Sequence, residues 1–62
     1  MSDGDDPRVH NRLGMQALAE HRFGDAAAAF SRAAELDPGE PLLRINLAAA
    51  WRQVGDEAAE QS

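Results

Sequence analysis

Two acidic residues followed by proline, Asp6-Pro7 and Glu40-Pro41, constrain the fold of this chain more than any other feature. An acceptor side chain before proline is typical of a helix start, because it can cap free backbone N–H groups and proline has no N–H to leave unpaired. The two starts lie 34 residues apart. A spacing of this length indicates a repeated helical unit rather than one continuous helix.

The segments that follow these starts predict three helices. The first is expected at about 7–20, the second at about 25–36 and the third at about 41–54. Apolar residues recur at helical spacing in the first segment, and alanine dominates the second. Asp37-Pro38-Gly39 is expected to stop the second helix, because a residue before proline is pushed out of helical geometry. Gly55 is expected to end the third helix as a left-handed C-cap.

A chain of 62 residues forms one small domain at most. We therefore expect an all-α fold, an antiparallel helix hairpin followed by a third helix. Residues 1–6 are predicted to be a disordered acidic tip, and residues 7–54 the three-helix unit. Residues 55–62 are expected to be a frayed tail or the start of a truncated fourth helix, since alanine is their only apolar residue type.

The pattern of small and bulky residues resembles the signature of the tetratricopeptide repeat family. The matching residues are Leu13-Gly14, Ala17, Phe23, Ala26, Phe30, Ala33 and Asp37-Pro38, and the same spacing continues into Leu47-Ala48 and Trp51. The resemblance covers one full repeat, about 7–40, and the first helix of a second. It implies a short α-solenoid fragment in which Gly14 and Ala26 let two helices approach closely. Leu13, Phe23 and Phe30 would fill the space beside them.

The chain also departs from the family pattern at two places. Ala17 stands where the motif usually has an aromatic residue, and Glu60 falls where a second unit would need a small packing residue. The third helix would present Leu43, Leu47 and Trp51 to the first repeat. It is apolar nearly all round, which favours burial on more than one side.

By this resemblance, the first helices of successive repeats line a groove that binds a protein or peptide partner. The candidate partner-binding residues are Asn11, Arg12, Met15, Leu42, Ile45, Asn46, Ala49, Trp51 and Arg52. The Asn46 amide can bond a partner's backbone N–H and C=O together, or it bonds its own repeat or water. Arg12 and Arg52 either pair with a partner's carboxylates or are solvated. Trp51 either dominates binding at an exposed face or packs against Phe30.

Composition argues against several other functions. A net charge of -5 is unfavourable for nucleic acid or an anionic membrane surface, and no apolar stretch is long enough to span a bilayer. The chain has no cysteine, and neither His10 nor His21 lies near a nucleophile pattern. We therefore expect no enzymatic activity, no cofactor and no metal site. A cytoplasmic location and a bacterial source are expected, the latter from the lysine-free composition rich in alanine, arginine and glycine.

Three functional hypotheses remain open from the sequence. The first is a protein-interaction module that uses the groove and the apolar third helix. The second is an N-terminal scaffold segment of a longer protein, since similar arrays precede the catalytic domain in bacterial aspartyl/asparaginyl hydroxylase-like proteins. The third is a homodimer in which two copies bury each other's third helix.

Overall fold

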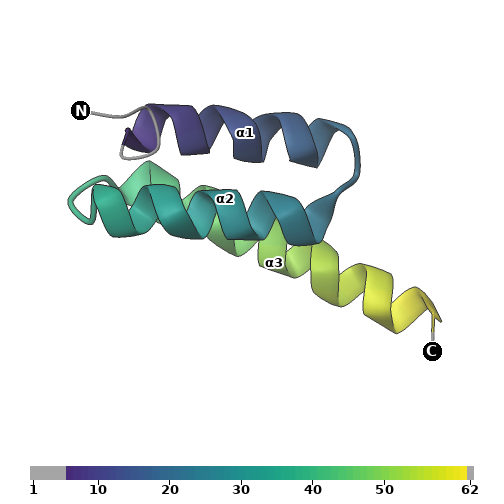
Figure 1. Cartoon of the computed structure of the whole chain (residues 1–62). Helices are drawn as coiled ribbons and strands as arrows, with labels where there is room; N and C mark the ends of the chain where they lie inside the picture. Colours follow the sequence, from purple (N-terminus) through teal and green to yellow (C-terminus); the bar gives the residue numbers. More distant parts are fainter. Residues whose placement is uncertain (1–5, 62) are drawn as a thin grey trace.

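The computed structural model describes residues 6–61, and it confirms the all-α fold (Figure 1). The three helices are α1 (Pro7–Ala19), α2 (Phe23–Leu36) and α3 (Pro41–Gln61). They alternate in direction, and α2 packs against both α1 and α3. The predicted disordered tip, apart from Asp6, lies outside the described residues, as does Ser62.

Both acid-proline pairs start a helix in the structure. The Asp6 carboxylate accepts a hydrogen bond of 2.9 Å from the backbone N–H of Arg8, and Pro7 occupies the first helical turn. The Glu40 carboxylate accepts one of 3.2 Å from the backbone N–H of Leu42. Each acidic side chain thus satisfies one N–H group that the helix itself leaves unpaired.

The turn between α1 and α2 is shorter than the sequence pattern suggests. Helix α2 begins at Phe23, whereas the prediction placed its start near Asp25. His21 makes the turn with a φ of 60°, in the left-handed region, and its ring stacks on Phe23 with centroids 5.4 Å apart. Gly24 and Asp25 therefore lie inside the first turn of α2, where an acidic side chain is favoured by the positive end of the helix dipole.

Helix α3 does not end at Gly55, which corrects the predicted boundary. The helix continues to Gln61, and no described glycine has a positive φ. A left-handed glycine stops a helix most effectively when the next residues make an apolar contact. Residues 56–61 offer only alanine for such a contact, and their Ala, Glu and Gln residues favour helix. The cost of one glycine inside a helix, about 1 kcal/mol, does not outweigh that preference.

Phe30 is the centre of the core. It is fully buried, and three alanines of the same cluster, Ala26, Ala27 and Ala50, have no exposed surface either. Gly14 on α1 faces the ring directly. A Cβ at Gly14 would lie only 2.6 Å from Phe30 Cε1, so the absence of a side chain there sets how closely α1 approaches α2.

Several large residues expected in the core are more exposed than predicted. Leu13 is 50% exposed and Phe23 is half-buried, so neither fills the space beside Gly14 as Phe30 does. Trp51 is 57% exposed, whereas Leu43 and Ala50 are buried. Positions 43 and 50 are seven residues apart and share one helix face. Trp51 follows Ala50 and is turned about 100° away from that face.

Candidate functional site

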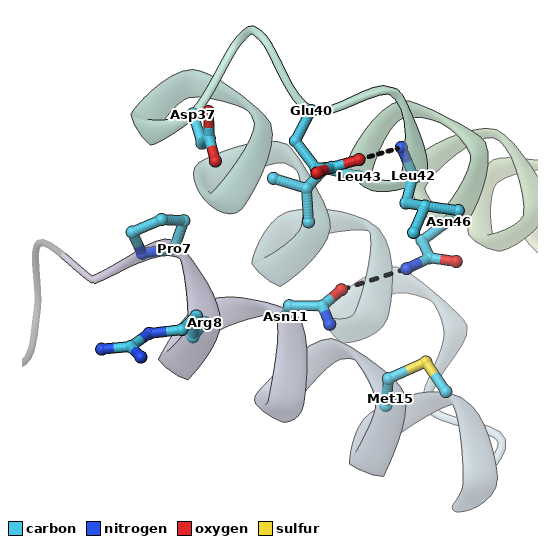
Figure 2. A pocket seen from close by; sticks show the side chains of 9 residues that line it. All are labelled: Pro7, Arg8, Asn11, Met15, Asp37, Glu40, Leu42, Leu43 and Asn46. Atoms are coloured by element: carbon cyan, nitrogen blue, oxygen red, sulfur yellow. Dashed lines mark hydrogen bonds between the residues drawn. The ribbon is translucent and has the colours of Figure 1, made fainter.

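A pocket of about 470 Å³ lies between the N-terminal halves of α1 and α3 (Figure 2). It is open to one side, and the turn between α2 and α3 closes one of its ends. Its lining residues are Pro7, Arg8, Asn11, Met15, Asp37, Glu40, Leu42, Leu43 and Asn46. The pocket exists because α1 and α3 start at the same end of the molecule and both pack on α2, which holds them side by side.

Two asparagines join the walls of this pocket. Asn46 Nδ2 donates a hydrogen bond of 3.0 Å to Asn11 Oδ1, which directly links α3 to α1 (Figure 2). Both side chains are only partly buried. The bond leaves Asn11 Nδ2 as a donor and Asn46 Oδ1 as an acceptor, because each amide has one group still unused. The asparagine pair therefore presents an unused amide nitrogen on Asn11 and an unused amide oxygen on Asn46, at the two ends of the bonded pair (Figure 2).

Apolar side chains flank the asparagine pair. Met15 is 52% exposed and Leu42 is 62% exposed, and they lie on α1 and α3 respectively. Leu43 is buried and contributes the base of the wall near the α2–α3 turn. A pocket of this kind offers apolar contact on both sides of a polar centre, the usual composition of a site that binds a ligand of mixed polarity.

The charged groups at the pocket mouth are largely engaged with their own neighbours. Arg8 Nη2 lies 3.0 Å from Asp6 Oδ2, and Arg8 Nε donates to Asp6 Oδ1 at 3.2 Å. These hydrogen bonds lower the pKa of Asp6 below its ordinary value and raise the pKa of Arg8. Glu40 is occupied by the Leu42 N–H. Asp37 also lines the pocket and is exposed, and no ion pair of the described residues engages its carboxylate. The pocket mouth therefore keeps the negative charges of Asp37 and Glu40, whereas the charge of Arg8 is paired.

The structure divides the nine predicted partner-binding residues into two groups. Asn11, Met15, Leu42 and Asn46 line the pocket together. The other five are exposed and do not line it: Arg12, Ile45, Ala49, Trp51 and Arg52. Within α3, Ile45 and Arg52 are turned by about 100° or more from Asn46, whereas Ala49 shares the face of Leu42 but lies one turn beyond Asn46, past the end of the pocket.

Five lining residues were not among the predicted partner-binding residues: Pro7, Arg8, Asp37, Glu40 and Leu43. A signal for three of them was present. The first and third helices of an alternating hairpin run parallel, so their starts and the turn between the second and third helices meet at one end. Pro7, Asp37 and Glu40 all belong to that end.

A second, smaller hollow lies between the C-terminal half of α1 and the N-terminal half of α2. It measures about 290 Å³ and includes Leu13, Gln16 and Arg22. Arg22 forms ion pairs with both neighbouring carboxylates, at 2.7 Å with Asp25 and 3.4 Å with Glu20, and these raise the pKa of Arg22. Its charge is thus already paired, and the hollow has no counterpart of the asparagine pair.

Residues 6–61 contain no group of three or more metal-ligating side chains placed to hold an ion. None of their helices is both long enough and apolar enough to cross a membrane. Comparison of the chain with known protein families, characterised proteins and solved structures found no match.

Proposed function

We propose that this chain is a protein-interaction module of the tetratricopeptide type, and that the pocket between α1 and α3 binds an extended peptide segment of a partner protein. The observation that carries the proposal is the Asn11–Asn46 pair on the pocket floor. The 34-residue spacing of the two helix starts and the contact of Gly14 with Phe30 support the family assignment. A bacterial cytoplasmic setting and the absence of catalysis belong to the same proposal.

The asparagine pair suits a peptide backbone. An extended peptide presents C=O and N–H groups that alternate along the chain. In this proposal, Asn11 Nδ2 donates to a peptide carbonyl and Asn46 Oδ1 accepts from a peptide N–H. Because each asparagine is already held by the other at 3.0 Å, the two free groups are positioned before a partner arrives. Such preorganisation reduces the entropy that binding must overcome.

The flanking side chains indicate what the peptide carries. Met15 and Leu42 are both more than half exposed, and they lie on opposite walls. A partner with an apolar side chain on one or both sides of the bound peptide unit would bury these surfaces. Methionine adapts to side chains of different shapes, so we expect the pocket to accept several different apolar side chains at this position of the peptide.

The charges around the pocket disfavour an acidic partner segment. Arg8 is paired with Asp6, whereas the carboxylates of Asp37 and Glu40 line the pocket without a cation partner among the described residues. Like charges at a binding surface repel, and this repulsion between exposed groups is screened by salt. The expected partner segment is therefore short, extended and apolar, and it carries no acidic side chain at this end of the pocket.

The proposal can be tested with nuclear magnetic resonance, because Asn11 and Asn46 are the only asparagines of the chain. The probes are peptides selected from a displayed library of random sequences against the wild-type chain. We expect the two asparagine side-chain amide signals to shift on titration. Asn46→Ala should weaken the selected peptides by up to about thirtyfold, because two hydrogen bonds worth about 1 kcal/mol each are affected.

Gln16→Ala is the matched control, since it removes an exposed amide on α1 outside this pocket. It should leave peptide affinity unchanged. The proposal fails if the selected peptides shift signals elsewhere but leave both asparagine amides unmoved. It also fails if Asn46→Ala, shown by circular dichroism to be folded, binds as tightly as the wild type.

A further inference from the structure

The side of α3 that faces away from the core is a second exposed surface, separate from the pocket. We call it the outer face, and its members are Ile45, Ala48, Trp51, Arg52 and Gly55. All five are exposed, including two large apolar side chains, Ile45 at 61% and Trp51 at 57%. None of the five lines the pocket between α1 and α3.

The charges along α3 are segregated. Its first fourteen residues, 41–54, carry Arg44 and Arg52 and no acidic residue, whereas 55–61 carry Asp56, Glu57 and Glu60 and no basic one. No ion pair within the described residues engages any of these five side chains. The C-terminal part of α3 also projects beyond α1 and α2 (Figure 1).

This order of charges opposes the helix dipole. A helix is stabilised by acidic side chains near its N-terminus and basic ones near its C-terminus. In α3 the only acidic group near the start is the cap, Glu40; within the helix no acidic residue lies in the first turn and no basic residue in the last. The charge pattern therefore does not serve the isolated helix, and its natural complement is a helix with the same pattern running the opposite way.

We propose that the outer face of α3 pairs with α3 of a second copy of this chain, antiparallel and about a two-fold axis. A helix that is positive at one end and negative at the other is complementary to itself in this arrangement, as a two-fold contact requires. The two helix dipoles also run in opposite directions. Each projecting acidic end then lies along the basic part of the other copy.

The side chains of the outer face fit such a contact. Ala48 and Gly55 are small, and opposing one to the other lets two helix backbones approach closely. Trp51 and Ile45 flank this strip and become covered. Helical side chains lean toward the N-terminus of their own helix. In an antiparallel pair Arg52 of one copy and Asp56 of the other therefore lean toward each other.

Charge reversal tests the pairing. Arg52→Glu and Asp56→Arg each place like charges at both symmetric Arg52–Asp56 contacts, and each is expected to raise the dimer dissociation constant about tenfold. An equimolar mixture of the two variants restores attraction at both contacts. It should form a heterodimer about as tightly as the wild type forms its dimer. Recovery on mixing can arise only from contact between the two variants, because each variant by itself has charges of the same sign at positions 52 and 56.

The measurement is the mass in solution by sedimentation, from low micromolar to millimolar protein at low salt, with Trp51 fluorescence on the same samples. The wild type is expected to associate with a blue shift of Trp51 emission, and salt should weaken the association. Arg32→Glu on α2 is the control for Arg52→Glu, because it changes the net charge by the same amount, and it should not affect the dimer. Asn46→Ala should also leave the dimer intact, so a failure of peptide binding and a failure of dimerisation are distinguishable.

Three results would overturn the inference. The first is a wild type that stays monomeric through millimolar concentration at low salt. The second is a mixture of the two charge variants that remains monomeric while the wild type dimerises. The third is a blue-shifted Trp51 emission that does not change with concentration, since that would mean the residue is covered within its own chain.

Discussion

Gly14→Ala is the substitution that most directly tests the packing of this fold. The new Cβ would lie 2.6, 2.7 and 2.8 Å from the Cε1, Cδ1 and Cζ atoms of Phe30. Ordinary carbon contacts begin near 3.5 Å, so the ring or the helix must move by almost an ångström. Phe30 is fully buried among alanines of α2 and α3 and has no open space to enter.

Two opposing terms set the size of the effect. Alanine is favoured over glycine inside a helix by about 1 kcal/mol. Overpacking a close-packed core costs about 1–3 kcal/mol, and three short contacts with one ring place this site at the upper end. We expect a net loss of about 1–2 kcal/mol from a total stability of about 3–9 kcal/mol for a chain of this size. The thermal midpoint should fall by about 5–15 °C.

The assay is thermal and urea unfolding followed by circular dichroism, at one low protein concentration for every variant. Gly55→Ala is the matched control, because a Cβ there meets nothing within 4 Å and the residue lies inside α3. It should stabilise the chain by up to about 1 kcal/mol. Destabilisation by this control would mean that α3 ends at Gly55 in solution.

A double variant separates the clash from other effects. Phe30→Leu removes the ring, so adding Gly14→Ala to it should cost less than in the wild type, by at least about 1 kcal/mol. The reasoning is refuted if Gly14→Ala is as stable as the wild type. It is also refuted if the cost of Gly14→Ala is the same with and without the Phe30 ring.

The remaining predictions concern the start of α1 and the exposed tryptophan. The hydrogen bonds from Arg8 lower the pKa of Asp6 in the folded chain below its ordinary pKa of 3.8. The ionised carboxylate therefore stabilises the fold at pH values above 3.8, and this stabilisation is lost as the pH falls through the lowered pKa. Asp6→Asn keeps an acceptor for the cap but does not titrate, so its unfolding midpoint should fall less between neutral pH and about pH 2, with Asp56→Asn as the control. Trp51→Ala should cost less than about 1 kcal/mol in the dilute monomer, whereas Phe30→Ala should cost about 3–5 kcal/mol, a large part of the total stability. Equal losses in urea unfolding for these two variants would contradict the burial assigned to them.

Part of the candidate site followed from the sequence. Helical spacing grouped Leu42 and Asn46 with Ile45, Ala49 and Arg52 on one face of the third helix, and of these five only Leu42 and Asn46 line the pocket. The family resemblance named Asn11 and Met15 on the first helix, and both line the pocket. The hydrogen bond between Asn11 and Asn46 did not follow, because it depends on the distance between two helices that are joined only through α2. The sequence likewise could not show that Arg8 is engaged by Asp6 at the pocket mouth.

The sequence was enough to predict the helical class and the starts of α1 and α3, and the family resemblance singled out Gly14 and Phe30 as packing residues. The helical class and these two helix starts depend on neighbours within a few positions along the chain, such as a capping carboxylate, a proline or a residue one turn away. The tertiary structure decided which side of α3 is buried, that Ala50 rather than Trp51 enters the core, and that the helix continues past Gly55. These outcomes depend on how far α2 extends beside α3 and on which contacts remain for the residues beyond it. These contacts join residues that are far apart in the sequence, so a local sequence pattern cannot predict them.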